Sequence, residues 1–416
     1  MTHPQESLEQ LKERYAAVQA KQLQLDMTRG KPGPEQLDLA NAMLTLVDGD
    51  HYKDDAGTDC RNYGVVDGLP AAKRLFADFL ECDAEEVIIG GNASLTLMHN
   101  YIARAMLHGV PGSPRPWCRE SAVRFLCPVP GYDRHFNVCK EMGIEMIPVA
   151  MNDEGPDMDQ VERLVAEDAS IKGIWCVPKY ANPNGVTYSD TVVDRLASMT
   201  TAAPDFRILW DNAYAHHHLY DQEDQLKNIL QACKQCGNPN RVIMLGSTSK
   251  ISFAGAGVSA MACSVENRSD VLGHVKMETI GNDKLNQLRH LRFFQNMAGI
   301  RAHMKRHAAI LRPKFEGVRK VLTRELEGTG LATWTQPRGG YFICLDTAPG
   351  LAKRVVALAG AAGVKLTPAG ATHPNGHDPD DKTIRIAPSM PSLPAILEAT
   401  EVMALCVKLA AAEKNA

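Results

Sequence analysis

The sequence predicts an α/β protein in which a mostly parallel sheet is followed by a smaller α+β unit. Through the middle of the chain, short apolar runs alternate with segments of helical period that are long enough to be crossover helices. From about residue 286 the pattern changes to a long helical stretch, a few strands and a final helix. With 416 residues, the chain has the length of two or three domains and can bury a large core.

Seven apolar runs predict the strands of the sheet. They lie at residues 86–89, 123–129, 144–149, 173–177, 207–210, 242–245 and 259–263. Their nearly continuous apolar character is typical of strands that are covered on both faces. We therefore expect a large domain over residues 51–290.

The remaining segments predict a small domain made of both chain ends. A helical stretch covers residues 286–326, and a helix covers 393–412. The strands between them are expected at 340–345, 364–367 and 383–386. We expect residues 1–50 to complete this domain together with residues 291–416. Residues 372–381, rich in His, Pro, Gly and Asp, predict an exposed loop.

Charge and hydropathy exclude several classes of protein. The net charge of −4 offers no basic field for nucleic acid or an anionic membrane. The polar N-terminus lacks the apolar core of a signal peptide, and no apolar run is long enough to span a bilayer. We expect a soluble, cytoplasmic protein.

The eleven cysteines form no disulfide framework. Cys127, Cys176 and Cys344 lie in strand-like runs, which predicts buried, reduced thiols. Cys233 and Cys236 have a metal or redox spacing, but no second pair completes a zinc site. We expect structural cysteines and no metal.

Residues just after the predicted strands are the first candidates for a site, because open α/β sheets bind ligands at the carboxyl ends of their strands. Gly90 and Gly91, followed by Asn92, Ala93 and Ser94 at a helix start, expose backbone N–H groups to an anion. This turn fits a phosphate cradle. The alternative is a plain strand-to-helix turn capped by Asn92 or Ser94.

Two further turns carry polar side chains. Asn182 lies in the proline-fixed turn at 180–185 and is able to donate to a ligand oxygen or to bond its own backbone. Asp211 ends a buried strand, where a carboxylate is costly without a cation. A protonated pyridine nitrogen would serve as that cation; a local salt bridge or a helix cap is the alternative.

Lys250 follows the small residues Gly246 to Ser249 after another apolar run. A lysine there can form a Schiff base with pyridoxal phosphate (PLP), while the hydroxyl residues before it reach a phosphate. Taken alone, this segment also fits a solvated loop lysine. The order of all four turns along successive strands is the specific signal.

With these motifs in this order, the chain resembles the fold-type I PLP-dependent aminotransferases of class I/II, most closely a divergent aspartate aminotransferase-like subgroup. The resemblance runs from Arg29-Gly30-Lys31-Pro32 to Arg385. It implies the PLP-transferase fold type I, with a mostly parallel seven-stranded sheet in the large domain and a smaller α+β domain.

The resemblance also implies roles for individual residues. Lys250 would bind PLP covalently and then move the substrate proton, and Asp211 would pair with the pyridinium nitrogen. Asn182 and Tyr214 would bond the phenolate oxygen. The other cofactor contacts would come from Asn92, Ala93, Ser94 and Ser247 at the phosphate, Tyr132 stacked on the ring, and Tyr63 reaching the phosphate of the neighbouring subunit, which implies an obligate homodimer.

On the substrate side, the resemblance assigns the α-carboxylate to Arg385, and a guanidinium fork suits that task. On base rates, an arginine alternating with apolar residues in a strand is usually on an exposed face. The segment with Arg29, Gly30 and Lys31 is expected to contact the substrate too, and Arg29 or Lys31 is the candidate for a distal carboxylate. Both are also compatible with a place on the surface.

Two segments depart from the pattern or invite another interpretation. Relatives carry an arginine in a Gly-x-Arg-x-Gly segment that clamps the phosphate, and residues 253–259 contain none. The missing contact is worth roughly 1.5 to 3 kcal/mol, so we expect compensation by hydroxyls or by a cation from elsewhere. His216, His217 and His218 suggest a metal, but neighbours in an extended segment point to opposite faces; we predict a structural role beside the cofactor site.

The reaction implied by the resemblance is transamination by a ping-pong route between an L-amino acid, which the subgroup suggests is aspartate, and 2-oxoglutarate. Alternatives are an aromatic or broad-range aminotransferase, a PLP-dependent lyase, and a non-enzymatic regulator. Regulators of this kind carry a DNA-binding domain in front of the aminotransferase-like part. Only 28 residues precede the Arg29 motif, which counts against a regulator.

Overall fold

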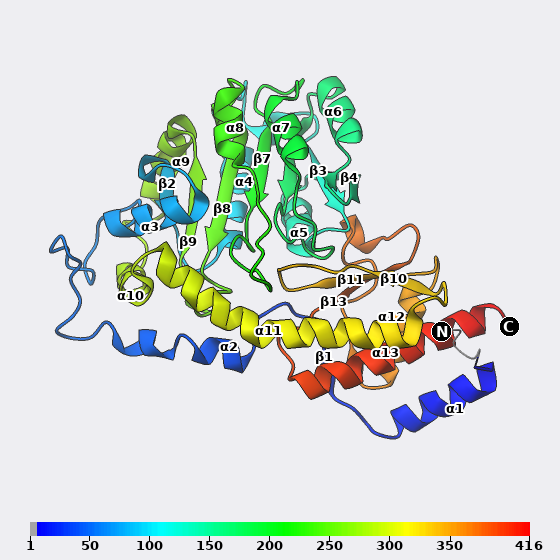
Figure 1. Ribbon diagram of the computed structural model, residues 1–416. Helices are drawn as coiled ribbons and strands as arrows, with labels where there is room; N and C mark the ends of the chain where they lie inside the picture. Colours follow the sequence, from blue (N-terminus) through cyan, green and yellow to red (C-terminus); the bar gives the residue numbers. More distant parts are fainter. Residues whose placement is uncertain (1–5) are drawn as a thin grey trace.

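A large mixed sheet forms the upper part of the protein in Figure 1, above a smaller sheet. The structure is a computed structural model, and it describes residues 6–416. The strand order is β2-β9-β8-β7-β6-β3-β4-β5. The strands are β2 (Val87–Ile89), β3 (Arg124–Val129), β4 (Glu145–Asn152), β5 (Gly155–Pro156), β6 (Ile171–Cys176), β7 (Arg207–Asp211), β8 (Val242–Ser247) and β9 (Ser259–Cys263).

All seven predicted strands belong to this sheet, and the five from β8 to β4 are mutually parallel. The eighth strand, β5, pairs antiparallel with the end of β4. With two residues, β5 is too short to show an apolar pattern in the sequence. Strand β9 runs antiparallel to both β8 and β2.

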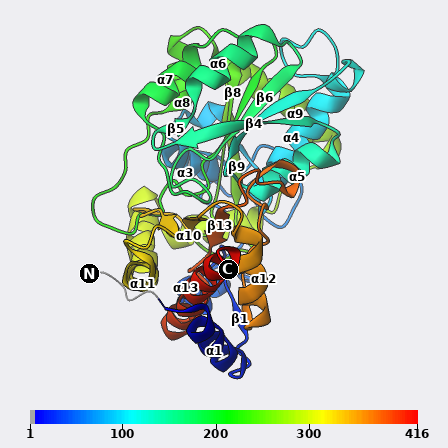
Figure 2. The ribbon, with the colours of Figure 1, turned by 90° about the vertical axis from the view of Figure 1, so that its right-hand side faces the viewer.

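Helices cover both faces of the sheet, as Figure 2 shows. One face carries α3 (Pro70–Leu80), α6 (Met158–Glu167), α7 (Asp190–Ser198) and α8 (Ile229–Gln235); the other carries α4 (Ser94–His108), α5 (Asp133–Glu141) and α9 (Val265–Glu278). Each face buries its own hydrophobic cluster, and this explains the apolar character of the strands.

The predicted helical stretch 286–326 is two helices, α10 (Lys284–Phe294) and α11 (Met297–Leu326). Between them, Gln295 adopts a left-handed φ of 62°, and the Asn296 side chain accepts from the backbone N–H groups of Ala298 and Gly299. Asn296 is thus the N-cap of α11, so the chain turns where the pattern predicted continuous helix.

The C-terminal part contains a second, antiparallel sheet of order β10-β11-β13. Its strands are β10 (Ala332–Trp334), which the sequence pattern missed, β11 (Ile343–Thr347) and β13 (Thr383–Ile386). Helices α11, α12 (Ala352–Ala361) and α13 (Leu393–Lys414) pack around a third hydrophobic cluster.

The N-terminal residues join this part of the molecule. Strand β1 (Leu25–Asp26) pairs in parallel with β12 (Val364–Lys365), and α1 (Leu8–Gln19) lies against α13. The Tyr15 hydroxyl donates to the Leu358 carbonyl at 2.7 Å. The remaining short helices are α2 (Pro34–Asp38) and the 3-10 turns η1 (Asn41–Thr45), η2 (Ala84–Glu86), η3 (Trp117–Arg119), η4 (Pro239–Arg241) and η5 (Pro374–Gly376).

The prediction of an exposed loop at residues 372–381 was wrong for four of its ten residues. Thr372, His373, Pro374 and Asp378 are buried. The Thr372 carbonyl accepts from the Gly131 amide at 2.8 Å, and the Asp378 carboxylate accepts from the amides of Lys382 and Thr383. These contacts fold the segment back onto the protein. Among the described residues, no helix has the length and apolar character needed to cross a membrane.

Candidate active site

The ends of β6, β7 and β8 bring three of the predicted residues together. Asn182 follows β6, Asp211 ends β7, and Lys250 follows β8. Arg385, on β13 of the smaller sheet, reaches the same place and donates from Nη1 to Asn182 Oδ1 at 3.3 Å. The site therefore lies where the two sheets meet.

Asp211 is a buried carboxylate with one free oxygen. Its side chain is enclosed, Oδ2 accepts from His135 Nε2 at 3.0 Å, and Oδ1 has no partner among the described residues. A buried anionic oxygen without a donor is costly, so the site calls for a cationic N–H at this point. A protonated pyridine nitrogen meets that need, and the residues fit PLP.

His135 is a site residue that the sequence analysis missed. It lies on α5, and its ring stacks on Trp175 with 4.4 Å between centroids and 10° between planes. The stack fixes the ring that donates to Asp211. The available signal was its place one turn after Tyr132, at the start of a helix that follows a predicted strand.

The Lys250 ammonium lies 4.9 Å from the centre of the Tyr214 ring. Burial lowers the pKa of Lys250 by removing water from the ammonium, and the Asp211 carboxylate opposes that shift only in part. The neutral amine, which is the nucleophile and proton acceptor, is therefore more populated than in a surface lysine.

Two donors hold the backbone carbonyl of Lys250. The Tyr341 hydroxyl donates to it at 3.2 Å, and His217 Nε2 donates at 3.3 Å. Burial keeps the pKa of His217 well below its usual value, so the ring is neutral. The contact between His217 and the Lys250 carbonyl agrees with the structural role predicted for residues 216–218. His216 turns away and contacts the Phe79 carbonyl.

A buried network extends this support to the N-terminal segment. Gln36 Nε2 donates to the Tyr341 hydroxyl and contacts His307 Nδ1, each at 2.9 Å. His307 contacts His303 at 3.0 Å, and His303 reaches the Ile251 carbonyl at 2.8 Å. The backbone carbonyls of Lys250 and Ile251 are thus tied to α2 and α11.

Arg385 is enclosed, and polar and aromatic contacts fix its orientation. Nη1 donates to Asp133 Oδ1 at 3.0 Å, and the guanidinium carbon lies 5.0 Å from the Phe342 ring centre. Nε is buried and has no hydrogen-bond partner within residues 6–416. An arginine in such a strand usually lies on an exposed face, but Arg385 is only 7% exposed. A free donor edge in this setting suits a carboxylate.

Gly30 packs against the Phe342 ring, and a methyl group at this position would overlap the ring. The glycine therefore lets the N-terminal segment lie close to the aromatic side chain that supports Arg385. Arg29 and Lys31 on either side are exposed.

The predicted phosphate turn lies at the N-terminus of α4. Ala93 is the extended N-cap, and no side chain caps the first turn, so the N–H groups that begin at Ser94 face outward. Asn92 is exposed; its amide donates to the Gly255 carbonyl at 3.3 Å, and its carbonyl accepts from Ser249 Oγ at 2.6 Å. Ser247, at the end of β8, is half-buried.

The segment without the expected arginine is braced by an amide side chain. Asn286 Nδ2 donates to the carbonyls of Ala256 at 3.1 Å and Gly257 at 2.8 Å. At Gly257 a side chain would overlap the Ser249 backbone. These contacts order the loop and bring no cation to it.

The remaining predicted residues differ in their surroundings. Tyr214 is buried among His217, Tyr341 and Phe342. Tyr132 lies with its ring 5.0 Å from that of His135, and burial, with Asp211 nearby, raises the pKa of its hydroxyl to about 12. Tyr63 is 80% exposed.

Comparisons with known proteins agree with this geometry. The family model described as aspartate amino-transferase matches residues 3–416. An aspartate aminotransferase of Corynebacterium glutamicum is 46% identical over 408 residues, which cover 98% of this chain and 94% of that protein. A protein of Mycolicibacterium smegmatis, provisionally named an aminotransferase, is 53% identical over 96% of this chain and 94% of its own length.

Solved structures give the same result. The crystal structure of an aspartate transaminase from Corynebacterium glutamicum superposes with a TM-score of 0.96 at 46% identity, over 98% of this chain and 96% of that one. An α-aminoadipate aminotransferase from Thermus thermophilus, complexed with N-(5'-phosphopyridoxyl)-L-leucine, shares the fold with a TM-score of 0.77 at 20% identity. The chain therefore belongs to the aspartate aminotransferase family and is a PLP-dependent aminotransferase.

Proposed function

We propose that the enzyme transfers the amino group of an L-amino acid, with aspartate preferred, to 2-oxoglutarate by a ping-pong route. The observation that carries this proposal is the convergence of Lys250, the free oxygen of Asp211 and the free donor edge of Arg385 in one site. The name of the Corynebacterium glutamicum relative supports aspartate as the donor.

The same proposal assigns each residue around the cofactor. Asp211 holds the pyridine nitrogen, Asn182 and Tyr214 hold the phenolate oxygen, and Tyr132 covers the ring. The phosphate is held by Asn92, Ala93, Ser94 and Ser247 at the α4 N-terminus. When bound, PLP withdraws electrons from the substrate Cα, and this makes the Cα proton removable.

Lys250 Nζ is the group that moves this proton. Because its pKa is lowered, the Lys250 amine is neutral more often than that of a surface lysine, which favours it as the group that accepts the Cα proton and later returns it. Tyr341 and His217 fix its backbone, which limits where Nζ can reach.

Arg385 orients the substrate. With Nη1 fixed by Asp133 and Asn182, its remaining N–H groups bind the α-carboxylate in one orientation, and this determines which Cα bond faces the ring. Arg29 and Lys31 are exposed beside Gly30, and we propose that one of them meets the distal carboxylate of aspartate.

The proposal includes a cytoplasmic homodimer with shared sites. Exposed Tyr63 would reach the phosphate of the neighbouring subunit. Residues 51–290 would form the large domain, and residues 1–50 and 291–416 the small one. Mixing Lys250→Ala and Tyr63→Phe subunits tests this arrangement, because one of the two sites in each mixed dimer would regain both native residues. Activity of the mixture that never exceeds that of Tyr63→Phe alone would contradict shared sites.

The substrate assignment is tested with a panel of amino donors against 2-oxoglutarate, using PLP-loaded enzyme. We expect aspartate to give the highest kcat/KM and to leave the cofactor in its amine form, which 2-oxoglutarate reverses. A higher kcat/KM with aromatic donors would replace the substrate assignment, and a cofactor that never enters the amine form would indicate a lyase. The control Lys250→Ala should lose all turnover and the absorbance of lysine-bound PLP.

A further inference from the structure

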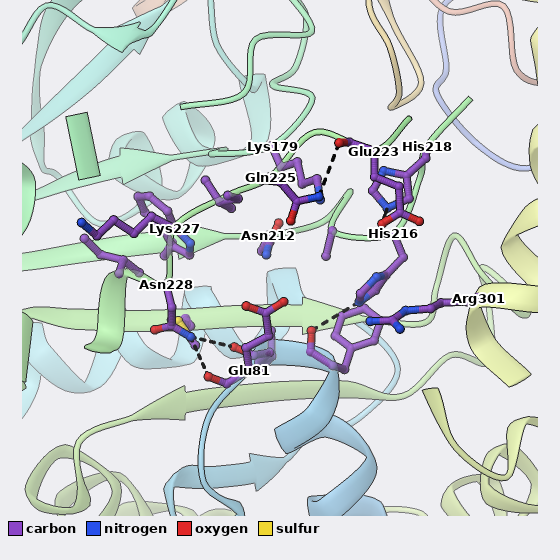
Figure 3. Close-up of a pocket in the computed structure, with 17 residues that line it drawn as sticks. Glu81, Lys179, Asn212, His216, His218, Glu223, Gln225, Lys227, Asn228 and Arg301 are labelled. Atoms are coloured by element: carbon purple, nitrogen blue, oxygen red, sulfur yellow. Dashed lines mark hydrogen bonds and ion pairs between the residues drawn. The ribbon is translucent and has the colours of Figure 1, made fainter. Parts of the chain in front are cut away.

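A polar cavity lies outside the site described above (Figure 3). It has a volume of about 130 Å³ and lies between the C-terminus of α3, the loop that follows Asn212 and the N-terminal part of α11. The polar lining that matters here comprises Glu81, Lys179, Asn212, His216, His218 and Arg301. A second cavity of about 250 Å³ shares both histidines and Arg301 with it.

Lys179 is the most informative residue of this cavity. It is 9% exposed, and among residues 6–416 its ammonium has no hydrogen bond or ion pair; the Tyr180 ring centre lies 5.7 Å away. Burial lowers the pKa of Lys179, and the charges of Glu223, Asp224 and Glu81 offset this in part. A buried cation without a partner is costly, so its presence points to a bound counter-ion.

Two further groups offer donors to the same space. Asn212 has a buried side-chain oxygen with no partner in the described part of the chain. Rotation of the terminal amide by about 180° would present its NH₂ group to the cavity instead. Arg301, exposed at the edge of the cavity, likewise forms no ion pair with any residue from 6 to 416.

The other charged residues of the lining are mostly committed to contacts of their own. Lys227 pairs with Asp194 at 2.7 Å, and Glu223 Oε2 lies 3.3 Å from His218 Nε2. Burial lowers the pKa values of His216 and His218 to about 4, so both rings are neutral. Glu81 and Glu223 are the lining carboxylates, and among residues 6–416 neither forms a hydrogen bond or ion pair with Lys179 or Arg301.

We propose that this cavity binds a compact oxyanion, either phosphate or a small carboxylate, with Lys179 as its principal ligand and Arg301 at the entrance. The site is separate from the carboxylate site, because neither Arg385 nor Asn182 lines this cavity. Lys179, directly before the turn at 180–185, would contact the anion from one side, and Asn212, directly after Asp211, from another.

Calorimetric titration of the PLP-loaded enzyme tests the proposal. Inorganic phosphate is the first probe and succinate the second, both at an ionic strength held constant with NaCl. We expect saturable binding of at least one, with a dissociation constant about tenfold or more higher in Lys179→Met, because a charge-assisted contact is lost. Succinate also binds at Arg385, but that contribution is common to both proteins and cancels in the comparison.

Two surface variants of α11 make the test independent of folding. Arg301→Gln should weaken binding, whereas Arg306→Gln, five residues further along the helix and outside the cavity lining, should bind as the wild type does. Saturation by phosphate alone would identify a phosphate site, and a Lys179-dependent difference with succinate alone a carboxylate site. Equal binding by wild type, Lys179→Met and Arg301→Gln for both anions would overturn the proposal.

Discussion

Replacing Asp211 by asparagine should weaken cofactor binding without weakening the fold. The substitution keeps the shape of the side chain, and its amide oxygen still accepts from His135. It removes the negative charge from the enclosed oxygen that has no partner in the described chain. Loss of this charge should therefore lower the cofactor affinity while leaving the stability of the cofactor-free protein equal or higher.

The size of the effect follows from this geometry. A hydrogen bond between charged groups is worth about 1.5 to 3 kcal/mol, so the dissociation constant of PLP should rise by roughly 10-fold to 150-fold. Without PLP, the variant should unfold at an equal or higher denaturant concentration, because an uncompensated buried charge has been removed.

Equilibrium dialysis against PLP gives the affinity, and urea unfolding of the cofactor-free protein gives the stability. Asp133→Asn is the matched control, since Asp133 is a nearby carboxylate that contacts Arg385 instead. It should keep the cofactor affinity within a factor of about three, less than 1 kcal/mol. An unchanged dissociation constant in Asp211→Asn would refute the role of the free oxygen.

Three other predictions concern the substrate, pH and the buried network. Arg385→Lys should raise KM for every amino donor about tenfold or more, because the fork geometry is lost, with a smaller change in kcat; steady-state kinetics with an unchanged KM would remove its role. Burial lowers the pKa values of His290 and His307 from 6.5 to about 4 and about 3. Their contribution to the free energy of unfolding is therefore fully present above pH 6.5 and is lost below it, because the unfolded chain then takes up protons that the folded chain does not. Between pH 7.5 and 5.5 each should cost about 1.4 kcal/mol of unfolding free energy, and His307→Gln should show a shallower pH dependence in urea titrations; an equal slope would contradict this. Gln36→Leu should cost about 2 to 4 kcal/mol by removing the three buried contacts of its side chain, to Tyr341, to His307 and to the Gly33 amide, whereas exposed Gln24→Leu should change little; equal urea midpoints would show that the network contributes nothing.

Much of the candidate site could be predicted from the sequence, because its residues lie at or shortly after the ends of apolar strands. Asn182, Asp211 and Lys250 each stand a few residues after a recognisable run, and parallel strands bring such positions to one edge. The support for Lys250 could not be predicted in this way. Gln36 and Tyr341 are separated by 305 residues, and no local pattern records that contact.

The errors have local causes of the same kind. Strand β10 has three residues and no apolar alternation to distinguish it. Asn296, a favourable N-cap residue, marks the break before α11. The prediction of one continuous helix followed the spacing of the apolar residues and overlooked this cap. The segment 372–381 has the composition of a loop, and contacts with Gly131 and residues 382–383 bury part of it.

The antiparallel strand β9 has a consequence for when the cofactor site can form during synthesis. Strand β2, which leads into the phosphate turn, bonds to the large sheet through β9, with Val87 opposite Ala262. The turn at residues 90–94 is thus not anchored until the chain has been made beyond residue 263. A contact over this sequence distance is slow to close, so the nascent chain should acquire PLP affinity late, after most of the sheet has assembled.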